Sequence, residues 1–220
     1  MRFLKYFLLF FISFLIVVGV VYGINLIKNT NSTLISSTVS GVKQNIDISF
    51  SPENAPTDSL KGQITSMTGW VDWLGRTATE STRISSPIMI QQGENLQTKE
   101  NSSLSFIFPE VGTVAMSGKT EVDIIQTLPT NIVFLQASGA AEYTKTGSDP
   151  ITIRAKKLIA SMEGELAISI DEERPWVTLT QKSGSTMVAF NDLKYVSHEI
   201  KMVAGQTYTF NYGMRKGVLK

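Results

Sequence analysis

Residues Leu104–Phe108 read LSFIF, with a large apolar side chain at the first, third and fifth positions. Side chains alternate between the two sides of an extended chain, so this spacing predicts a strand with one buried face. The same period of two recurs in ELAISI at 165–170 and in YTFNY at 208–212. The predicted core therefore includes Leu104, Phe106, Phe108, Leu166, Ile168, Ile170 and Phe210.

Further short segments with β-forming residues lie between turns that contain Gly, Pro, Asn or Asp. They are 64–73, 113–116, 122–125, 132–135, 151–155, 177–180, 187–190 and 200–203. Many short strands with turns at intervals of about ten residues are typical of an all-β sandwich, a barrel or a solenoid-like stack. The sequence leaves these three open. One short helix is predicted near 156–161, and IDISF at 46–50 has the alternation of an additional edge strand.

The N-terminal segment has a different character. No charged residue lies between Tyr6 and Ile27, where almost every side chain is apolar. As a helix this span would extend about 33 Å, which matches a hydrocarbon core of about 30 Å. The span therefore predicts one transmembrane helix at 6–27. A cleaved signal peptide is the alternative, but its apolar region is usually shorter and ends in an A-x-A-like site.

The charges around this helix predict its orientation. Arg2 and Lys5 lie on its short side, and the positive-inside rule keeps that side in the cytoplasm. We therefore expect a single-pass membrane protein with a cytoplasmic tail at 1–5 and an extracytoplasmic C-terminal domain. Residues 28–59, rich in Ser, Thr and Asn, predict a tether. A β domain at 60–213 and a C-terminal tail at 214–220 complete the expected organisation.

Composition limits the chemistry that this chain can perform. Its 20 basic and 19 acidic residues nearly balance, which is not typical of a nucleic-acid-binding surface. With no cysteine it has no disulfides, thiolate ligands or thiol nucleophile. The sequence also lacks a phosphate-binding glycine motif. We therefore expect no cofactor, no metal and no catalytic residue.

Candidates for acid–base chemistry are few. His198 is the only histidine, and its alternation with apolar neighbours favours a partly buried histidine on a strand over a catalytic one. The acidic run at 171–173 precedes Arg-Pro and is predicted to form a turn between two strands. With Glu163 and Glu165 it supplies the carboxylates that a wall-active hydrolase would need, which keeps that function as an alternative.

Trp70 and Trp73 are the candidate partner-binding residues. Three positions apart in an extended strand, they face opposite sides, so one is predicted in the core and the other exposed. An exposed tryptophan is a natural contact for a partner protein or a glycan. The alternative is that both rings pack within the fold.

Several segments also occur in a characteristic order along the chain. They are GWVDW at 69–73, GENLQT at 93–98, SLSFIF at 103–108, LQASG at 135–139, MEGELAI at 162–168 and VAGQ at 203–206. In this order the stretch 69–210 resembles the FecR domain, a β-rich extracytoplasmic module of bacterial envelope proteins. Two positions depart from the pattern: Glu110-Val111-Gly112 replaces a D-G turn, and Glu165 replaces a threonine.

The resemblance implies a binding or signalling module without catalysis. Well-known members of that family pass a signal to a sigma factor through an N-terminal cytoplasmic domain. Only Met1–Lys5 lies on that side here. We therefore expect an anchored scaffold or binding protein that contacts an envelope protein or a cell-wall polymer. A regulator of a sigma/anti-sigma system that acts through a partner membrane protein is the alternative.

Overall fold

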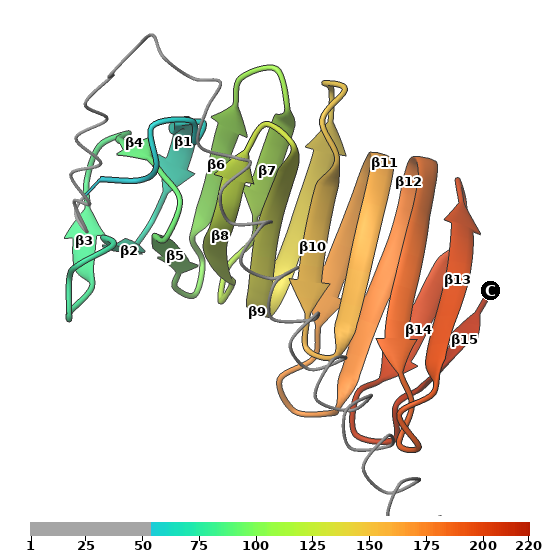
Figure 1. The fold of residues 1–220 in the computed structure, drawn as a ribbon. Coiled ribbons are helices and arrows are strands. Elements are labelled where there is room, and N and C mark those ends of the chain that lie inside the picture. The colour runs from blue at the N-terminus through green and yellow to red at the C-terminus, as the bar shows by residue number, and fades with distance from the viewer. Residues whose placement is uncertain (1–53) are drawn as a thin grey trace, which may run out of the picture. The chain divides into compact units, whose positions relative to one another are not determined.

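The computed structural model describes residues 54–220. The predicted transmembrane helix at 6–27 and the edge strand at 46–50 lie outside the described residues, as does most of the predicted tether. Residues 54–220 contain no helix long and apolar enough to cross a membrane. This part of the chain is all-β: its 15 strands form one continuous mixed sheet that folds over on itself into two layers (Figure 1).

Twelve of the strands each belong to one layer, as their pairing shows. The first layer contains β4 (Met89–Ile90), β1 (Gly62–Thr68), β6 (Ser103–Phe108), β7 (Gly112–Met116), β14 (Thr207–Asn211) and β15 (Lys216–Leu219). The second layer contains β3 (Thr82–Ile84), β2 (Val71–Leu74), β5 (Asn95–Thr98), β8 (Glu121–Leu128), β10 (Ile151–Ala155) and β13 (Ser197–Val203). The predicted all-β class is confirmed, and the described strands belong to one large mixed sheet.

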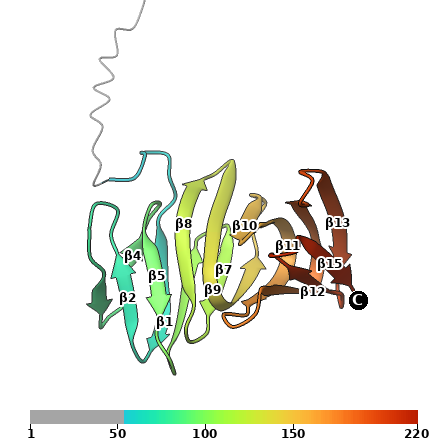
Figure 2. The same ribbon diagram turned by 90° about the horizontal axis from the view of Figure 1, so that it is seen from below.

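Three long strands run through both layers and join them. They are β9 (Asn131–Lys145), β11 (Leu158–Ile170) and β12 (Trp176–Asn191). The first part of β9 pairs with β8 and β10 in the second layer, and its last part pairs with β7 in the first. We call these three the crossing strands. Figure 2, a view from below, shows β9, β11 and β12 between the N-terminal strands of the domain and its C-terminal end.

Each crossing strand turns the corner at a glycine with positive φ. The residues are Gly139, Gly164 and Gly184, with φ of 73°, 80° and 77°. Gly164 and Gly184 are paired across β11 and β12, and a Cβ on either would lie 2.3 Å from a backbone oxygen of the other strand. Only glycine allows both this φ and this close approach.

Two corners are also stabilised by a buried glutamine three residues before the glycine. The Gln136 side-chain amide donates to the carbonyl oxygens of Gly139 and Ile168, at 2.9 and 3.2 Å. The Gln181 amide donates to the carbonyls of Glu163 and Ser183, at 3.0 and 2.6 Å. Both glutamines are fully buried. Their side-chain amides therefore provide hydrogen bonds to backbone carbonyls at the two corners, as buried polar groups require.

The core lies between the layers and confirms the predicted apolar positions. Phe106, Phe108 and Tyr143 of the first layer surround Phe134 of the second, with ring centroids about 6 Å apart. Phe190 and Phe210 make the corresponding contact near the C-terminal end, at 4.8 Å. All seven side chains predicted for the core are at most 4% exposed.

Four local expectations differ from the structure. The predicted helix at 156–161 is wrong: Lys156 adopts a positive φ of 54° in a turn, and β11 follows with apolar residues at every second position. The segments 177–180 and 187–190 are one strand, β12, bent at Gly184. The segment 64–73 is two strands, β1 and β2. The expected tail at 214–220 contains β15, which pairs with β14.

Candidate functional site

The turn between β1 and β2 fixes Trp70 on the surface. Gly69 has a φ of 75°, and a Cβ there would lie 2.5 Å from the hydroxyl oxygen of Ser102. That hydroxyl accepts a hydrogen bond from the backbone N–H of Trp70 at 2.8 Å. The Trp70 carbonyl in turn accepts from the N–H of Lys99 at 3.0 Å. The backbone that carries the ring is therefore held from both sides.

The indole ring of Trp70 is itself held in place, although 48% of the residue is exposed. Its ring N–H donates to the Asp72 carboxylate at 2.6 Å. The Arg83 guanidinium lies over the ring, 4.3 Å from its centroid. A cation–π contact of this kind at an exposed position contributes about 0.5–1 kcal/mol. The ring is thus oriented before any partner arrives.

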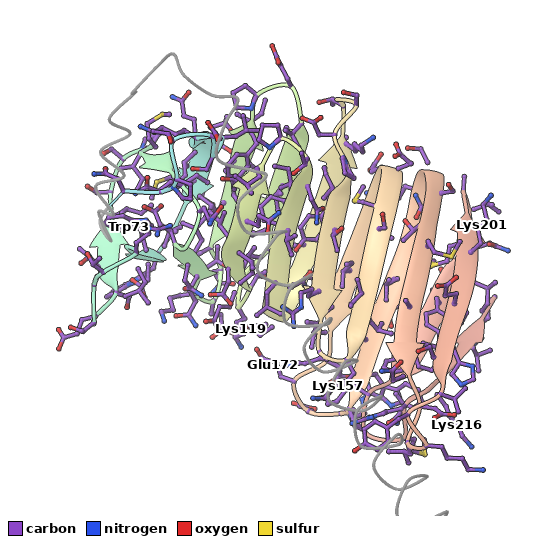
Figure 3. All side chains as sticks on the ribbon, viewed as in Figure 1. Trp73, Lys119, Lys157, Glu172, Lys201 and Lys216 are labelled. Atoms are coloured by element: carbon purple, nitrogen blue, oxygen red, sulfur yellow. The ribbon has the colours of Figure 1, made fainter. Side chains whose placement is uncertain are left out.

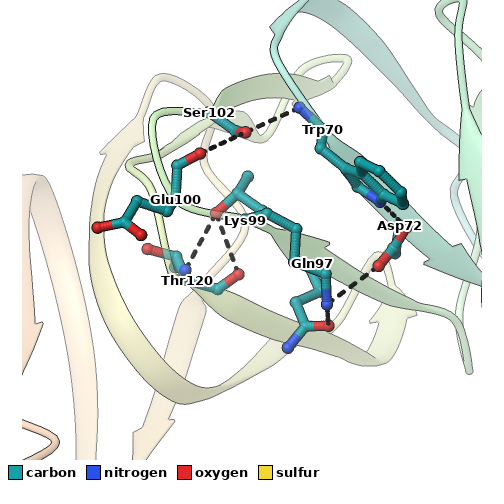
Figure 4. Close-up of polar contacts among 8 residues, drawn as sticks. Trp70, Asp72, Gln97, Lys99, Glu100, Ser102 and Thr120 are labelled. Atoms are coloured by element: carbon teal, nitrogen blue, oxygen red, sulfur yellow. Dashed lines mark hydrogen bonds and ion pairs between the residues drawn. The ribbon is translucent and has the colours of Figure 1, made fainter.

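Asp72 of β2, Gln97 of β5 and Lys99, the residue after β5, form a chain of polar contacts beside this ring (Figure 4). The Lys99 ammonium contacts the second oxygen of Asp72 at 3.1 Å and donates to the Gln97 amide oxygen at 2.6 Å. We call Trp70, Asp72, Arg83, Gln97 and Lys99 the Trp70 surface. It combines an aromatic ring with both signs of charge, a composition that suits contact with a polar partner.

Trp73 has a different environment. It lies on β2, packs against the core and donates its ring N–H to the Glu94 carboxylate at 2.9 Å. Glu94 is only 4% exposed and also accepts the backbone N–H of Gln91 at 3.1 Å. The indole N–H of Trp73 therefore provides a hydrogen bond that the buried Glu94 carboxylate needs. Trp70 is exposed, whereas Trp73 is partly buried against the core. Trp70 lies in the turn that precedes β2, not in one continuous strand with Trp73.

His198 lies on β13 as expected, but its side chain is 45% exposed, so the prediction of a partly buried ring is wrong in degree. It stacks on Phe190 and its Nε2 lies 3.1 Å from the Asp192 carboxylate. The hydrogen bonds from His198 and from the N–H groups of Val196 and Lys194 hold the pKa of Asp192 below its usual value. These contacts shape the loop that precedes β13.

The acidic candidates have different partners. Asp171 accepts the backbone N–H groups of Glu173 and Arg174 in the turn between β11 and β12, which confirms the predicted turn. Glu163 pairs with Lys145 at 2.7 Å, and Glu165 pairs with Lys182 at 3.1 Å. Within residues 54–220, no three His, Cys, Asp or Glu side chains gather where they could bind a metal ion.

Two further surface features were not expected. The loop 192–196, between β12 and β13, exposes Leu193, Tyr195 and Val196 by 62%, 79% and 52%. The outer face of the first layer carries a shallow hollow of about 390 Å³, lined by small residues such as Ser105, Ala140 and Thr178. Hydrophobic alternation could not indicate either, because loop exposure and the curvature of a sheet depend on long-range packing.

Comparisons with known proteins support the fold. No protein-family model and no curated protein sequence matches the chain. Two crystal structures from Parabacteroides distasonis ATCC 8503, at 2.50 and 1.65 Å resolution, are each described as "a putative anti-sigma factor". Each aligns with a TM-score of 0.50 and 10% sequence identity over 57% of this chain. The chain spans 58% of the length of those structures.

Proposed function

We propose that this protein is a membrane-anchored, extracytoplasmic binding or scaffolding protein with a FecR-like domain. It acts by contact with an envelope protein or a cell-wall polymer, and Trp70 is its contact residue. The observation that supports this most directly is the exposed Trp70 ring, held by Asp72 and Arg83. The proposal assigns no catalytic residue and no cofactor.

The geometry of Trp70 suits recognition for an energetic reason. Binding usually costs free energy because interface side chains lose rotamer freedom. Here the ring N–H and one face already have intramolecular partners, so little freedom remains to be lost. A tryptophan with this degree of order is a typical centre of an interface hot spot.

A regulatory role is the second candidate function. The fold similarity to a protein described as "a putative anti-sigma factor" favours it, as does the FecR resemblance of residues 69–210. In this version the domain senses a partner outside the cytoplasm and signals through a second membrane protein. A neighbouring sigma-factor gene would favour this candidate over a purely structural one.

The two tryptophans offer a direct test of the main proposal. Trp70→Ala should change the unfolding free energy by only about 1 kcal/mol, the value of its cation–π contact and exposed hydrogen bond. It should nevertheless abolish capture of an envelope protein by a photoreactive residue at position 68, or co-sedimentation with purified cell-wall sacculi. Trp73→Phe should leave both captures intact and cost about 1–3 kcal/mol, because Glu94 loses a buried donor.

Ile125→Ala is the matched control, since Ile125 is 40% exposed on β8 and belongs to no proposed surface. The protein or sacculus captured by the unmodified chain should be retained by this variant. If Trp70→Ala binds as well as Ile125→Ala in both assays, the Trp70 surface is not the contact. Capture of a protein alone, or of sacculi alone, assigns the class of partner.

The proposed topology has its own prediction, which uses the absence of cysteine. Val218→Cys, on a residue 60% exposed in β15, should react with a membrane-impermeant maleimide in intact spheroplasts. Phe3→Cys, on the short side of the apolar span, should react only after lysis. The reverse pattern would place the domain in the cytoplasm and contradict the proposal.

A further inference from the structure

Strand β13 forms the free edge of the second layer. It pairs with β12 on one side only among the described strands, and Figure 3 shows Lys201 at this end of the domain, opposite the end that carries Trp73. At the hairpin, the N–H of Asp192 donates to the carbonyl of Val196. Hydrogen-bonded pairs alternate along an antiparallel ladder, so Ser197, Glu199 and Lys201 direct their backbone N–H and C=O groups away from β12.

Such an edge can pair with another strand, and proteins usually protect it with charges. On β13 the protecting side chains carry charges of both signs. Glu199 and Lys201 are both exposed on the outer face, one on each side of Ile200. We propose that a second copy of this chain docks on β13, with the two β13 strands antiparallel about a two-fold axis at Ile200.

Charge complementarity selects this register. In it, Glu199 of each copy lies directly opposite Lys201 of the other, and both residues have their backbone groups on the pairing edge. A shift by two residues would place either two Glu199 or two Lys201 side chains opposite each other. Opposite charges across a strand pair are stabilising and like charges are destabilising, so only the centred register is favoured. The symmetry makes the interface isologous, with each contact formed twice.

The ends of β13 support the same occupant. Tyr195 and Val196 are exposed before the strand, and Val203 is 47% exposed at its other end. Antiparallel pairing about Ile200 brings the 195–196 end of one copy beside the 203–205 end of the other. Gly205 leaves open space there, since a Cβ at that position would meet no atom within 4 Å.

The loop before β13 is already ordered for such a contact. The Asp192 carboxylate accepts the N–H groups of Lys194 and Val196 at 2.8 and 3.0 Å. Tyr195 adopts a φ of 62°, which is unusual for a bulky residue. Its ring lies 5.7 Å from the Arg215 guanidinium. A strained and fixed backbone that presents an aromatic ring outward is typical of a functional surface.

Cysteine cross-linking of the full chain in its membrane tests this arrangement. Residues in a non-hydrogen-bonded antiparallel pair have Cα atoms about 4.5 Å apart, within the range of a disulfide. Ile200→Cys should therefore form a covalent dimer of twice the chain mass under mild oxidation. Arg154→Cys, exposed on the outer face that also carries Glu199 but on the interior strand β10, should form at least about tenfold less.

A second pair of variants does not disturb the half-buried Ile200. Glu199→Cys combined with Lys201→Cys should cross-link, while each single cysteine should do so poorly because its opposite residue is unchanged. In the Ile200→Cys chain, Glu199→Lys or Lys201→Glu should lower the yield by about tenfold, and the double exchange should restore it. Restoration distinguishes a charge pair from general damage.

Four results would overturn the proposal. Three of them are equal dimer yields from Ile200→Cys and Arg154→Cys, no dimer from either cysteine design, and a yield unaffected by charge reversal. A cross-linked product of another mass would show that a different protein occupies the edge, which also overturns it. None of these readouts uses Trp70, so the outcome is independent of the proposed function.

Discussion

Gly164→Ala is expected to destabilise the domain by about 2–5 kcal/mol, a large share of a typical stability of about 5–15 kcal/mol. Two costs add. A residue with a Cβ at a φ of 80° is strained, and that Cβ would lie 2.3 Å from the carbonyl oxygen of Ser183. The obstacle is backbone of β12, so relief would require the two crossing strands to separate. Urea unfolding of the fragment 54–220, followed by circular dichroism, measures the loss.

Gly205→Ala is the matched control for this experiment. Gly205 has an even larger φ of 86°, but no atom lies within 4 Å of its Cβ position. It should therefore cost only the conformational strain, about 1–2 kcal/mol. If the two variants lose the same stability, the close approach of β11 and β12 contributes nothing and our account of the corner is wrong.

Gln181→Met is expected to cost about 3 kcal/mol or more, although it preserves the length and apolar stem of the side chain. The change removes the donor for the carbonyls of Glu163 and Ser183, and it leaves the hydroxyl of Thr186 without its acceptor. Each buried polar group left unsatisfied costs about 1–3 kcal/mol. Gln136→Met should behave alike, because it frees the carbonyls of Gly139 and Ile168.

Gln97→Met provides the comparison for the glutamine variants. Gln97 lies on β5 and accepts a hydrogen bond from Lys99 in an exposed position, so its loss should cost less than about 0.5 kcal/mol. Thermal unfolding of the three variants side by side makes the measurement. A Gln181→Met midpoint close to that of Gln97→Met would mean that water satisfies the corner carbonyls.

The strands that the sequence predicted well share one property. In β6 and β10 every second residue is apolar and buried, and in β14 Tyr208 and Phe210 are, so this local pattern directly reflects one buried face. The short strands β3 and β4 lack such alternation because few of their side chains reach the core. Their strand conformation follows from pairing with distant segments, which local periodicity does not contain.

The layer changes were missed for a different reason. Each half of β12 alternates correctly, but nothing local indicates that its halves pair with β14 and β13 in separate layers. One signal was nevertheless present. Residues 136–139 read QASG and residues 181–184 read QKSG, and in both corners the glutamine amide donates to a carbonyl two or three residues later, at or next to the positive-φ glycine. For the candidate site, spacing predicted that Trp70 and Trp73 would differ, while the roles of Asp72 and Arg83 required the fold.

The crossing strands also bear on how such a domain could have grown. Each one adds one strand segment to both layers at once, and the corners of β9 and β12 share a short Q-x-S-G sequence. Because neighbouring crossing strands are antiparallel, duplication of two adjacent strands with their turns would lengthen the domain and keep the direction of the chain that follows. Because additions of this kind would fall between β9 and β13, the end that carries Trp70 would keep its shape while the distance to the β13 edge changed. Relatives of different length could then share the Trp70 end and differ in the distance between that end and the β13 edge.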